Sequence, residues 1–396
     1  MSRVESTHSL KEQAVAKAGL DDFGDRWFER PLAAWAEDLQ GPLLSERGRG
    51  FMTRLAVANL VRRLELIECF KRNPSIGDVV IPSIVYITGL ERSGTTLLHN
   101  LLALHPRSRT LLRWELMRAT PPPDAATYRS DARIAEVQAS IEPLRGTMLE
   151  QMHWVNADEP EECTWGAYDC TGLLGQAAGT LMPTWARFLR ESDMSPSYRE
   201  YRRLIKLLTW RNPVEGGGHL VLKCPQNSRH IKELAGVLPE ARFVFTHRDP
   251  FRTTVSVCAL ADHISSSFTA RPDLFQPGGS SIANIITSAE LGLGCMISFD
   301  SGSSDRVVNV AYPALVREPS TIVRGVYQRF DMACPGDLDV RIGGFVAAQA
   351  GGKRKAPPRE LPSYGLESGA FRARPAVAAY CDRFGVQAEI NRITGG

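Results

Sequence analysis

The chain has 396 residues, of which 43% are hydrophobic and 23% charged, an ordinary composition for a globular protein with a large core. The formal net charge of +3 is too small to indicate nucleic-acid binding, although it is compatible with local basic sites for an anionic ligand. The N-terminus lacks the apolar core of a signal peptide, and no stretch approaches the roughly 18 uninterrupted apolar residues of a membrane helix. We therefore expect a cytoplasmic protein with no membrane span.

The 8 cysteines show neither a C-x-x-C pair nor a tight cluster. Ligand cysteines of structural metal sites are closely spaced, so this distribution argues against a metal site or a disulfide framework. We expect most of these cysteines to be reduced and buried.

In chain order, residues 9–72 carry apolar side chains at helical spacing, as in LAVANLVRRLELIECF. IVYITG at 84–89 is typical of a buried strand, and TTLLHNLLAL directly after it predicts a helix. A proline-rich break at 120–124 precedes residues 128–212, which read mainly as helices around the acidic, aromatic segment HWVNADEPEECTWGAY.

Three further strands, HLVLK, ARFVFT and RVVNVAY, are each followed by a helical pattern: SRHIKELAGVL, a helix beginning near Asp249-Pro250, and EPSTIVRGVYQRF. Four strand-then-helix units predict a parallel sheet with helices on both faces. Residues 331–364 look irregular and basic, and a final helix is expected over 371–384.

The stretch IVYITGLERSGTT has the layout of a phosphate-binding loop, in which a strand and a tight turn lead into a helix. Gly89 and Gly94 have the spacing of G-x-x-x-x-G-K-[ST], but Thr95 stands where the lysine belongs. We expect the N–H groups of Gly94, Thr95 and Thr96 to bind an anion, with Arg92 supplying the positive charge. The alternative is an ordinary strand-to-helix turn capped by Ser93 or Thr95.

Without the lysine, and without an obvious acidic magnesium ligand after a later strand, this loop is poorly suited to ATP hydrolysis. A phosphosulfate carries only one negative charge on its reactive end, so hydrogen bonds and one cation would suffice to hold it. The loop therefore favours a phosphosulfate donor.

A second candidate site lies in FVFTHRDPFRTTVS, where Asp249 and Pro250 are typical of a helix N-cap and N1. Arg252 and Ser256 share a face of this helix, and Arg248 just before it can point to the same place. These groups could hold a second phosphate. Alternatively, they are a solvated arginine and an ordinary helix serine.

Together the two stretches resemble the sulfotransferases that use 3′-phosphoadenylyl sulfate (PAPS). In that family an [R/K]-x-G-T-T loop holds the 5′-phosphosulfate, and an arginine with a serine eight residues later holds the 3′-phosphate. The matching residues of this chain are Arg92, Ser93, Gly94, Thr95 and Thr96, and Arg248 with Ser256. The chain resembles the bacterial branch in particular over roughly residues 80–330, through GLERSGTTLLHNLLALHP, DEPEEC, LKCPQ and THRDP in that order.

The resemblance implies an α/β, P-loop-like three-layer fold with a central parallel sheet, helices on both faces and a large helical insertion. The expected organisation is an N-terminal helical segment (1–78), a sulfotransferase core (79–330) and a C-terminal basic loop and helix (331–396). The helical insertion, at about 110–212, would build the acceptor pocket.

The resemblance also implies a reaction: transfer of the sulfuryl group from PAPS to a hydroxyl or amine of a small molecule. The displacement would be in line and would need no metal, and adenosine 3′,5′-bisphosphate would be the second product. Arg92 would contact the bridging or sulfonyl oxygens, and Lys223 would reach the transferring sulfonate.

The chain departs from the family pattern at the general base. The animal cytosolic enzymes have Lys-Thr-His after the strand that matches LVLK, with the histidine as base, whereas Cys224-Pro225-Gln226 follows Lys223 here. We look for the base in HWVNADEPEE, with His153 and Glu161 as first candidates and Asp158, Glu159 and Glu162 as neighbours. Glu91, a carboxylate within an anion-binding loop, would point outward or toward the acceptor.

Two other functions stay open: an atypical magnesium-dependent nucleotide kinase, and a nucleotide-binding scaffold without turnover. The sequence identifies neither the acceptor nor the oligomeric state.

Overall fold

The computed structural model describes residues 6–145, 147, 150, 156–169, 171–172, 179–351 and 363–389. Its sheet consists of β1 (Ile84–Gly89), β2 (Ser108–Thr110), β3 (His219–Lys223), β4 (Ala241–His247) and β5 (Val307–Ala311), in the order β2-β3-β1-β4-β5. All neighbouring strands are parallel, and the carboxyl ends of β1, β3 and β4 lie level, with Ile87 opposite Lys223 and Gly89 opposite Thr246.

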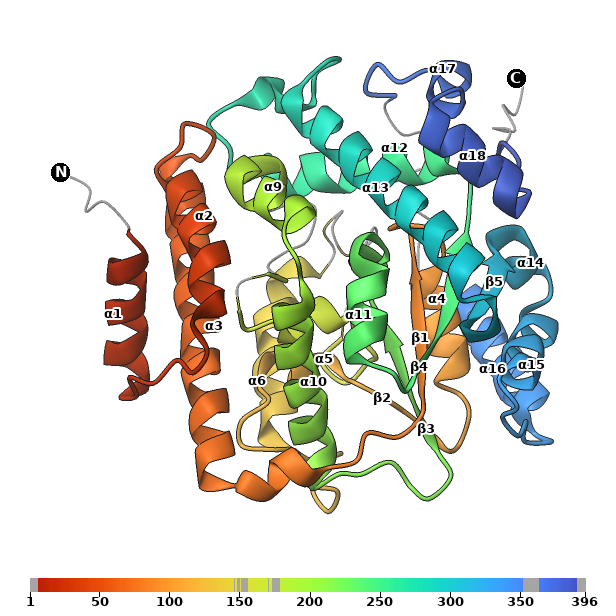
Figure 1. Cartoon of the computed structure of the whole chain (residues 1–396), viewed down its shortest axis with the longest axis horizontal. Helices are drawn as coiled ribbons and strands as arrows, with labels where there is room; N and C mark the ends of the chain where they lie inside the picture. Colours follow the sequence, from red (N-terminus) through yellow and green to blue (C-terminus); the bar gives the residue numbers. More distant parts are fainter. Residues whose placement is uncertain are drawn as a thin grey trace.

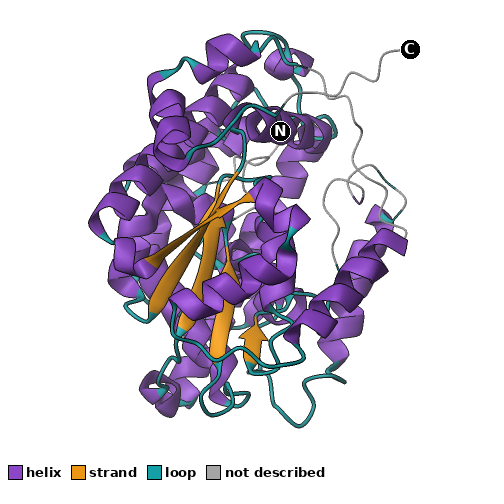
Figure 2. Ribbon diagram, turned by 90° about the vertical axis from the view of Figure 1, so that its right-hand side faces the viewer, coloured by secondary structure: helices purple, strands orange, loops and turns teal. Residues whose placement is uncertain are grey.

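Helices surround the sheet, which lies in the interior of the molecule (Figures 1 and 2). The helices are α1 (Thr7–Ala18), α2 (Glu29–Leu39), α3 (Glu46–Arg72), α4 (Thr95–Leu102), α5 (Arg113–Met117), α6 (Ala132–Ile141), α9 (Pro183–Glu191), α10 (Ser195–Trp210), α11 (Ile231–Val237), α12 (Pro250–Ser265), α13 (Ser280–Gly302), α14 (Tyr312–Arg317), α15 (Pro319–Arg329), α16 (Leu338–Gly351), α17 (Ser368–Arg372) and α18 (Pro375–Phe384).

The central strand β1 is buried along its whole length because both faces of the sheet are covered. Ile84 and Tyr86 pack into one apolar cluster with residues of α10, α11 and α13. Val85 and Ile87 point to the opposite face, where they meet residues of α4 and α15. This alternation explains the uninterrupted apolar run of the strand, and it confirms the three-layer α/β fold.

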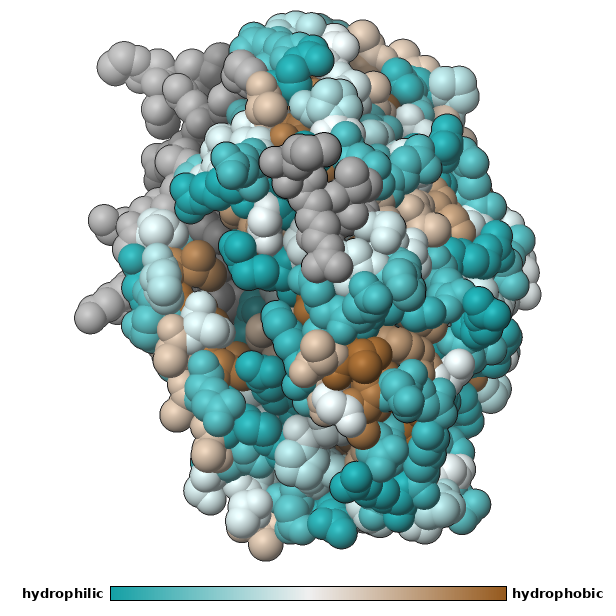
Figure 3. Space-filling model, turned by 90° about the vertical axis from the view of Figure 1, so that its left-hand side faces the viewer, coloured by the Kyte–Doolittle hydropathy of each residue, from teal (hydrophilic) through white to brown (hydrophobic). Residues whose placement is uncertain are grey.

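A third apolar cluster joins the N-terminal helices α1–α3 to α9, α12 and the start of α13. The helices α1 and α3 lie side by side at the edge of the molecule (Figure 1). On the space-filling surface of this side, hydrophilic residues dominate and hydrophobic ones gather only in small patches (Figure 3). These helices therefore bury their apolar faces against the rest of the chain.

The four expected strands and the helices that follow them are confirmed, although 3₁₀ residues Pro225–His230 precede α11. The short strand β2 was missed because three residues give no periodicity. The expectation of irregular structure over 331–364 is wrong in part, since α16 occupies Leu338–Gly351. The basic run 353–355 lies outside the described residues, and the domain boundaries stay predictions.

One helix of the described chain, α13, is long and apolar enough to cross a membrane by length and composition alone. Its residues Leu293, Met296 and Phe299 are buried in the cluster that covers the sheet. The cysteines of the described chain are free thiols.

Candidate active site

The loop after β1 begins with a close approach between two strand ends. Gly89 has a φ of 152°, and a Cβ at this position would lie 2.7 Å from the carbonyl oxygen of Thr246 at the end of β4. The Ser93 hydroxyl donates to the Leu90 carbonyl at 2.6 Å and shares a 2.6 Å hydrogen bond with the Thr246 hydroxyl. Ser93 is thus buried and braces the loop against β4.

The same loop ends at the N-terminus of α4. Gly94 is the N-cap with a φ of 98°, and a Cβ there would lie 2.5 Å from Cδ2 of Tyr312. Thr95 is buried, whereas Thr96 is exposed. The first N–H groups of α4 therefore lie at the carboxyl edge of the sheet, where a helix N-terminus favours an anion.

Arg92 connects this loop to the second predicted site. It has a φ of 70°, an unusual conformation for a residue with a side chain, of the kind found at binding sites. Its Nε donates to Oγ of Ser256 on α12 at 3.1 Å, and the Arg248 guanidinium donates to its carbonyl at 3.2 Å. Burial and the nearby Arg248 charge lower the pKa of Arg92. The structure thus brings the two predicted sites together.

A carboxylate from the C-terminal segment contacts Arg248. Nε and one Nη of Arg248 donate to the two oxygens of Glu389 at 2.7 and 2.9 Å, and the Glu389 N–H donates to Asp249 at 2.9 Å. The guanidinium also stacks on Tyr312, 4.3 Å from the ring centre. Burial lowers the pKa of Arg248, but the Glu389 carboxylate more than offsets this and raises it. Glu389 therefore occupies the two parallel N–H donors of Arg248, the residue predicted to bind a phosphate.

Lys223, the last residue of β3, lies beside the loop with its side chain 1% exposed. Its ammonium contacts Oε1 of Glu162 at 2.8 Å and lies 3.5 Å from the Thr96 hydroxyl. Burial lowers the pKa of Lys223, but Glu162 and Glu161 more than offset this, so the pKa lies above its usual value. Lys223 is thus a buried cation at the start of α4.

Two adjacent glutamates of the acidic segment, Glu161 and Glu162, pair with different basic residues. Glu161 pairs with Arg113 at 2.8 Å and accepts the N–H of Glu162 through its other oxygen. Glu162 faces Lys223 and is 15% exposed, and its Oε2 has no hydrogen-bond partner among the described residues. Glu159 accepts from Asn156 at 2.9 Å, and His153 lies outside the described residues.

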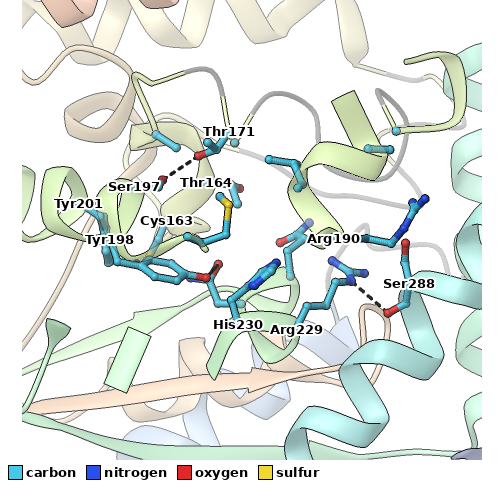
Figure 4. Close-up of a pocket in the computed structure, with 18 of the residues that line it drawn as sticks. Cys163, Thr164, Thr171, Arg190, Ser197, Tyr198, Tyr201, Arg229, His230 and Ser288 are labelled. Carbon is cyan, nitrogen blue, oxygen red and sulfur yellow. Dashed lines mark hydrogen bonds between the residues drawn. The ribbon is translucent and has the colours of Figure 1, made fainter. Parts of the chain in front are cut away.

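Glu91 turns toward a pocket. Its carboxylate contacts Arg229 at 2.6 Å, and Arg229 lines a cavity of about 110 Å³ between η4 (Cys163–Gly166), α9, α10, η5 (Pro225–His230) and α13. Figure 4 shows this cavity with the tyrosines on one side and Arg190, Arg229 and Ser288 on the other. It draws on the predicted helical insertion, and also on η5 and α13, which the sequence analysis did not foresee.

These features define an α/β protein with a lysine-free, P-loop-like loop at the carboxyl edge of a parallel sheet, beside a buried Lys–Glu pair. A sequence model described as the sulfotransferase family matches residues 82–335. This match covers more than half of the chain, and the chain belongs to the sulfotransferase family.

Two solved structures share the fold over nearly the whole chain. Sulfotransferase STF9 from Mycobacterium avium is 24% identical with a TM-score of 0.86, and the match covers 98% of this chain and 99% of that one. Sulfotransferase STF1 from Mycobacterium tuberculosis H37Rv is 24% identical with a TM-score of 0.80, over 96% and 100% of the two chains. No curated protein gives a significant match.

Sequence reasoning did not single out Tyr312 and Glu389, which contact Arg248, or Arg190, which lines the cavity. Tyr312 and Glu389 follow no motif, because they reach the loop only through the packing of distant segments. Arg190 lies in α9 without any signal that links it to a cavity. The predicted roles of Lys223, Glu161 and His153 in catalysis stay predictions.

Proposed function

We propose that this sulfotransferase moves the sulfuryl group of PAPS to a hydroxyl or amine of a small-molecule acceptor, by metal-independent in-line displacement. The observation that carries the proposal is the contact of Arg92 with both Ser256 and Arg248. The two candidate phosphate-binding groups thus adjoin at one edge of the sheet, and this supports a ligand that carries two phosphates.

Arg92 and the N-terminus of α4, with Gly94, Thr95 and Thr96, would hold the 5′ end of the donor. Arg248 and Ser256 would hold its 3′-phosphate, for which the planar guanidinium offers two parallel N–H donors. Glu389 now occupies those donors, so the phosphate would exchange with this carboxylate. Ser93 would act only by fixing the loop, since its hydroxyl is used within the protein.

In the transfer step the acceptor oxygen would bond to sulfur while the bond from sulfur to the bridging phosphate oxygen breaks. The bond's electron pair would leave on the phosphate, and Lys223 is positioned to stabilise this charge. The acceptor proton would go to Oε2 of Glu162, whose other oxygen holds the Lys223 ammonium. We prefer Glu162 to Glu161 as base, because Glu161 is held by Arg113 and by the Glu162 N–H.

Binding and turnover test different parts of the proposal. Calorimetry should detect metal-independent binding of adenosine 3′,5′-bisphosphate that is tighter than binding of ATP. Binding of Mg·ATP alone would instead indicate the kinase. Labelled donor with an acceptor panel should give turnover, and the rate should fall by about 100-fold or more in Lys223→Met and in Glu162→Gln, the scale of one lost catalytic group.

Glu161→Gln is the matched control, because it changes the neighbouring carboxylate, which is tied to Arg113. Bisphosphate binding should persist in all three variants. Equal turnover in Glu162→Gln and the wild type would reject Glu162 as base. Binding of the bisphosphate without turnover of any acceptor would support the scaffold.

A further inference from the structure

The pocket that Arg229 lines has two chemically different ends (Figure 4). At one end lie Cys163, Tyr198 and Tyr201, with the Tyr201 hydroxyl 2.6 Å from the Cys163 sulfur. Burial raises the pKa of the Cys163 thiol, while Tyr201 and the backbone N–H and charge of Lys223 lower it, so this thiol lies beside Lys223. This tyrosine end therefore adjoins the residues proposed to perform the transfer.

The opposite end carries two guanidinium groups. Arg229 is neutralised, because it contacts Glu91 at 2.6 Å and donates to the Ser288 carbonyl at 3.1 Å. Arg190 makes no ion pair or hydrogen bond with any residue that the structure describes, although it is partly buried in the wall. A partly desolvated guanidinium without an acidic partner favours an anion.

The charged residues around Arg190 also favour binding of an anion. Among the described residues that line the pocket, none is an aspartate or glutamate. Burial lowers the pKa of Arg190, exposed Glu191 opposes this, and the neighbouring Arg229 and Arg187 lower the pKa further. Asp169 is buried and does not line the pocket, and its carboxylate accepts the hydroxyl of the lining residue Thr171 at 2.7 Å. The uncompensated positive charge is thus confined to the Arg190 end.

We propose that the acceptor is an amphipathic alcohol or phenol that carries an anionic group, which Arg190 binds. Its apolar body lies along the wall formed by Trp185, Leu189 and Met194, and its hydroxyl lies at the tyrosine end, toward Glu162. This inference rests on the proposed function for the identity of the reacting end. The preference for an anion rests on the pocket alone.

A matched pair of fluorescent probes isolates the anionic group. 8-Anilinonaphthalene-1-sulfonate and N-phenyl-1-naphthylamine have the same ring system, and only the first carries a sulfonate. Their binding is measured with wild type, Arg190→Gln and Arg187→Gln, each with and without adenosine 3′,5′-bisphosphate. Arg187 is the control, because it is an exposed arginine of the same helix that does not line the pocket.

The wild type should bind the sulfonate probe about tenfold or more tightly than the neutral probe, the scale of one charge-assisted hydrogen bond. The preference should vanish in Arg190→Gln and persist in Arg187→Gln, with or without the bisphosphate. Equal affinity for both probes, or a preference that survives Arg190→Gln, would overturn the proposal. So would displacement of the sulfonate probe by the bisphosphate, because the probe would then occupy the donor site.

Calorimetry of the bisphosphate with Arg190→Gln keeps the two proposals apart. Unchanged bisphosphate binding together with loss of the probe preference supports both. Failure of the wild type to bind the bisphosphate would reject the proposed function, while the probes would still report on the pocket. In turnover assays, the wild type should have a higher kcat/KM for an acceptor with a free carboxylate than for its methyl ester. Arg190→Gln should remove that difference.

Discussion

The contact between Arg248 and Glu389 predicts that Glu389 competes with the proposed donor for binding to Arg248. Phosphate and the Glu389 carboxylate would compete for the same two guanidinium N–H groups. In Glu389→Gln the charge is lost while the backbone N–H that holds the segment on Asp249 is retained. The variant should therefore bind adenosine 3′,5′-bisphosphate more tightly than the wild type.

The magnitude follows from geometry and exposure. The pair is bidentate, at 2.7 and 2.9 Å, and its side chains are 24% and 26% exposed. Exposed pairs are worth about 0.2–1 kcal/mol and hydrogen bonds to charged groups about 1.5–3 kcal/mol, so this pair lies near 1 kcal/mol. Removing it should lower the Kd of the bisphosphate about fivefold.

Isothermal titration calorimetry at one fixed ionic strength measures this change. Glu290→Gln is the control, because Glu290 forms a comparable bidentate pair with Arg374 elsewhere on the surface. An unchanged or weaker affinity in Glu389→Gln would refute the competition. It would mean that Glu389 positions Arg248 for the donor.

Arg248→Gln should weaken bisphosphate binding by about 1–3 kcal/mol, as expected for loss of a charged hydrogen-bond partner, and unaltered calorimetric affinity would contradict the predicted 3′-phosphate site. Gly94→Ala should lower the free energy of unfolding by about 1–3 kcal/mol and weaken binding of the bisphosphate, because the φ of 98° at Gly94 and the 2.5 Å approach to Tyr312 exclude a Cβ. Gly236→Ala on α11, where a Cβ meets open space, is the control, and equal urea midpoints for the two variants would contradict the steric argument. Burial and the nearby Lys223 charge lower the pKa of His99 to about 3, so the folded state keeps it neutral, and stability should fall as the pH drops below the ordinary value of 6.5. Between pH 7 and pH 5 this one histidine should cost about 2 kcal/mol, and urea unfolding of His99→Gln should show a pH dependence smaller by that amount; an identical dependence would disprove the assignment.

The sequence by itself determined the local chemistry of the site. Buried parallel strands must be apolar on both faces, and a phosphate-type loop needs its glycines at fixed positions, so β1 and the loop at 89–96 could be recognised from the printed residues. The same holds for Asp249 and Pro250 at the start of α12, where the Asp249 side chain accepts the Phe251 N–H. These features depend on neighbours within a few residues, and such neighbours are visible in the chain.

Only the tertiary structure decided which charges meet. Glu161 and Glu162 are adjacent in sequence, yet one faces Arg113 and the other faces Lys223, because consecutive residues of an extended segment point to opposite sides. Glu389 reaches Arg248 across 141 residues, and no local pattern encodes such a contact. Ion pairs of this kind depend on the packing of whole elements, which sets the distances on which charges act.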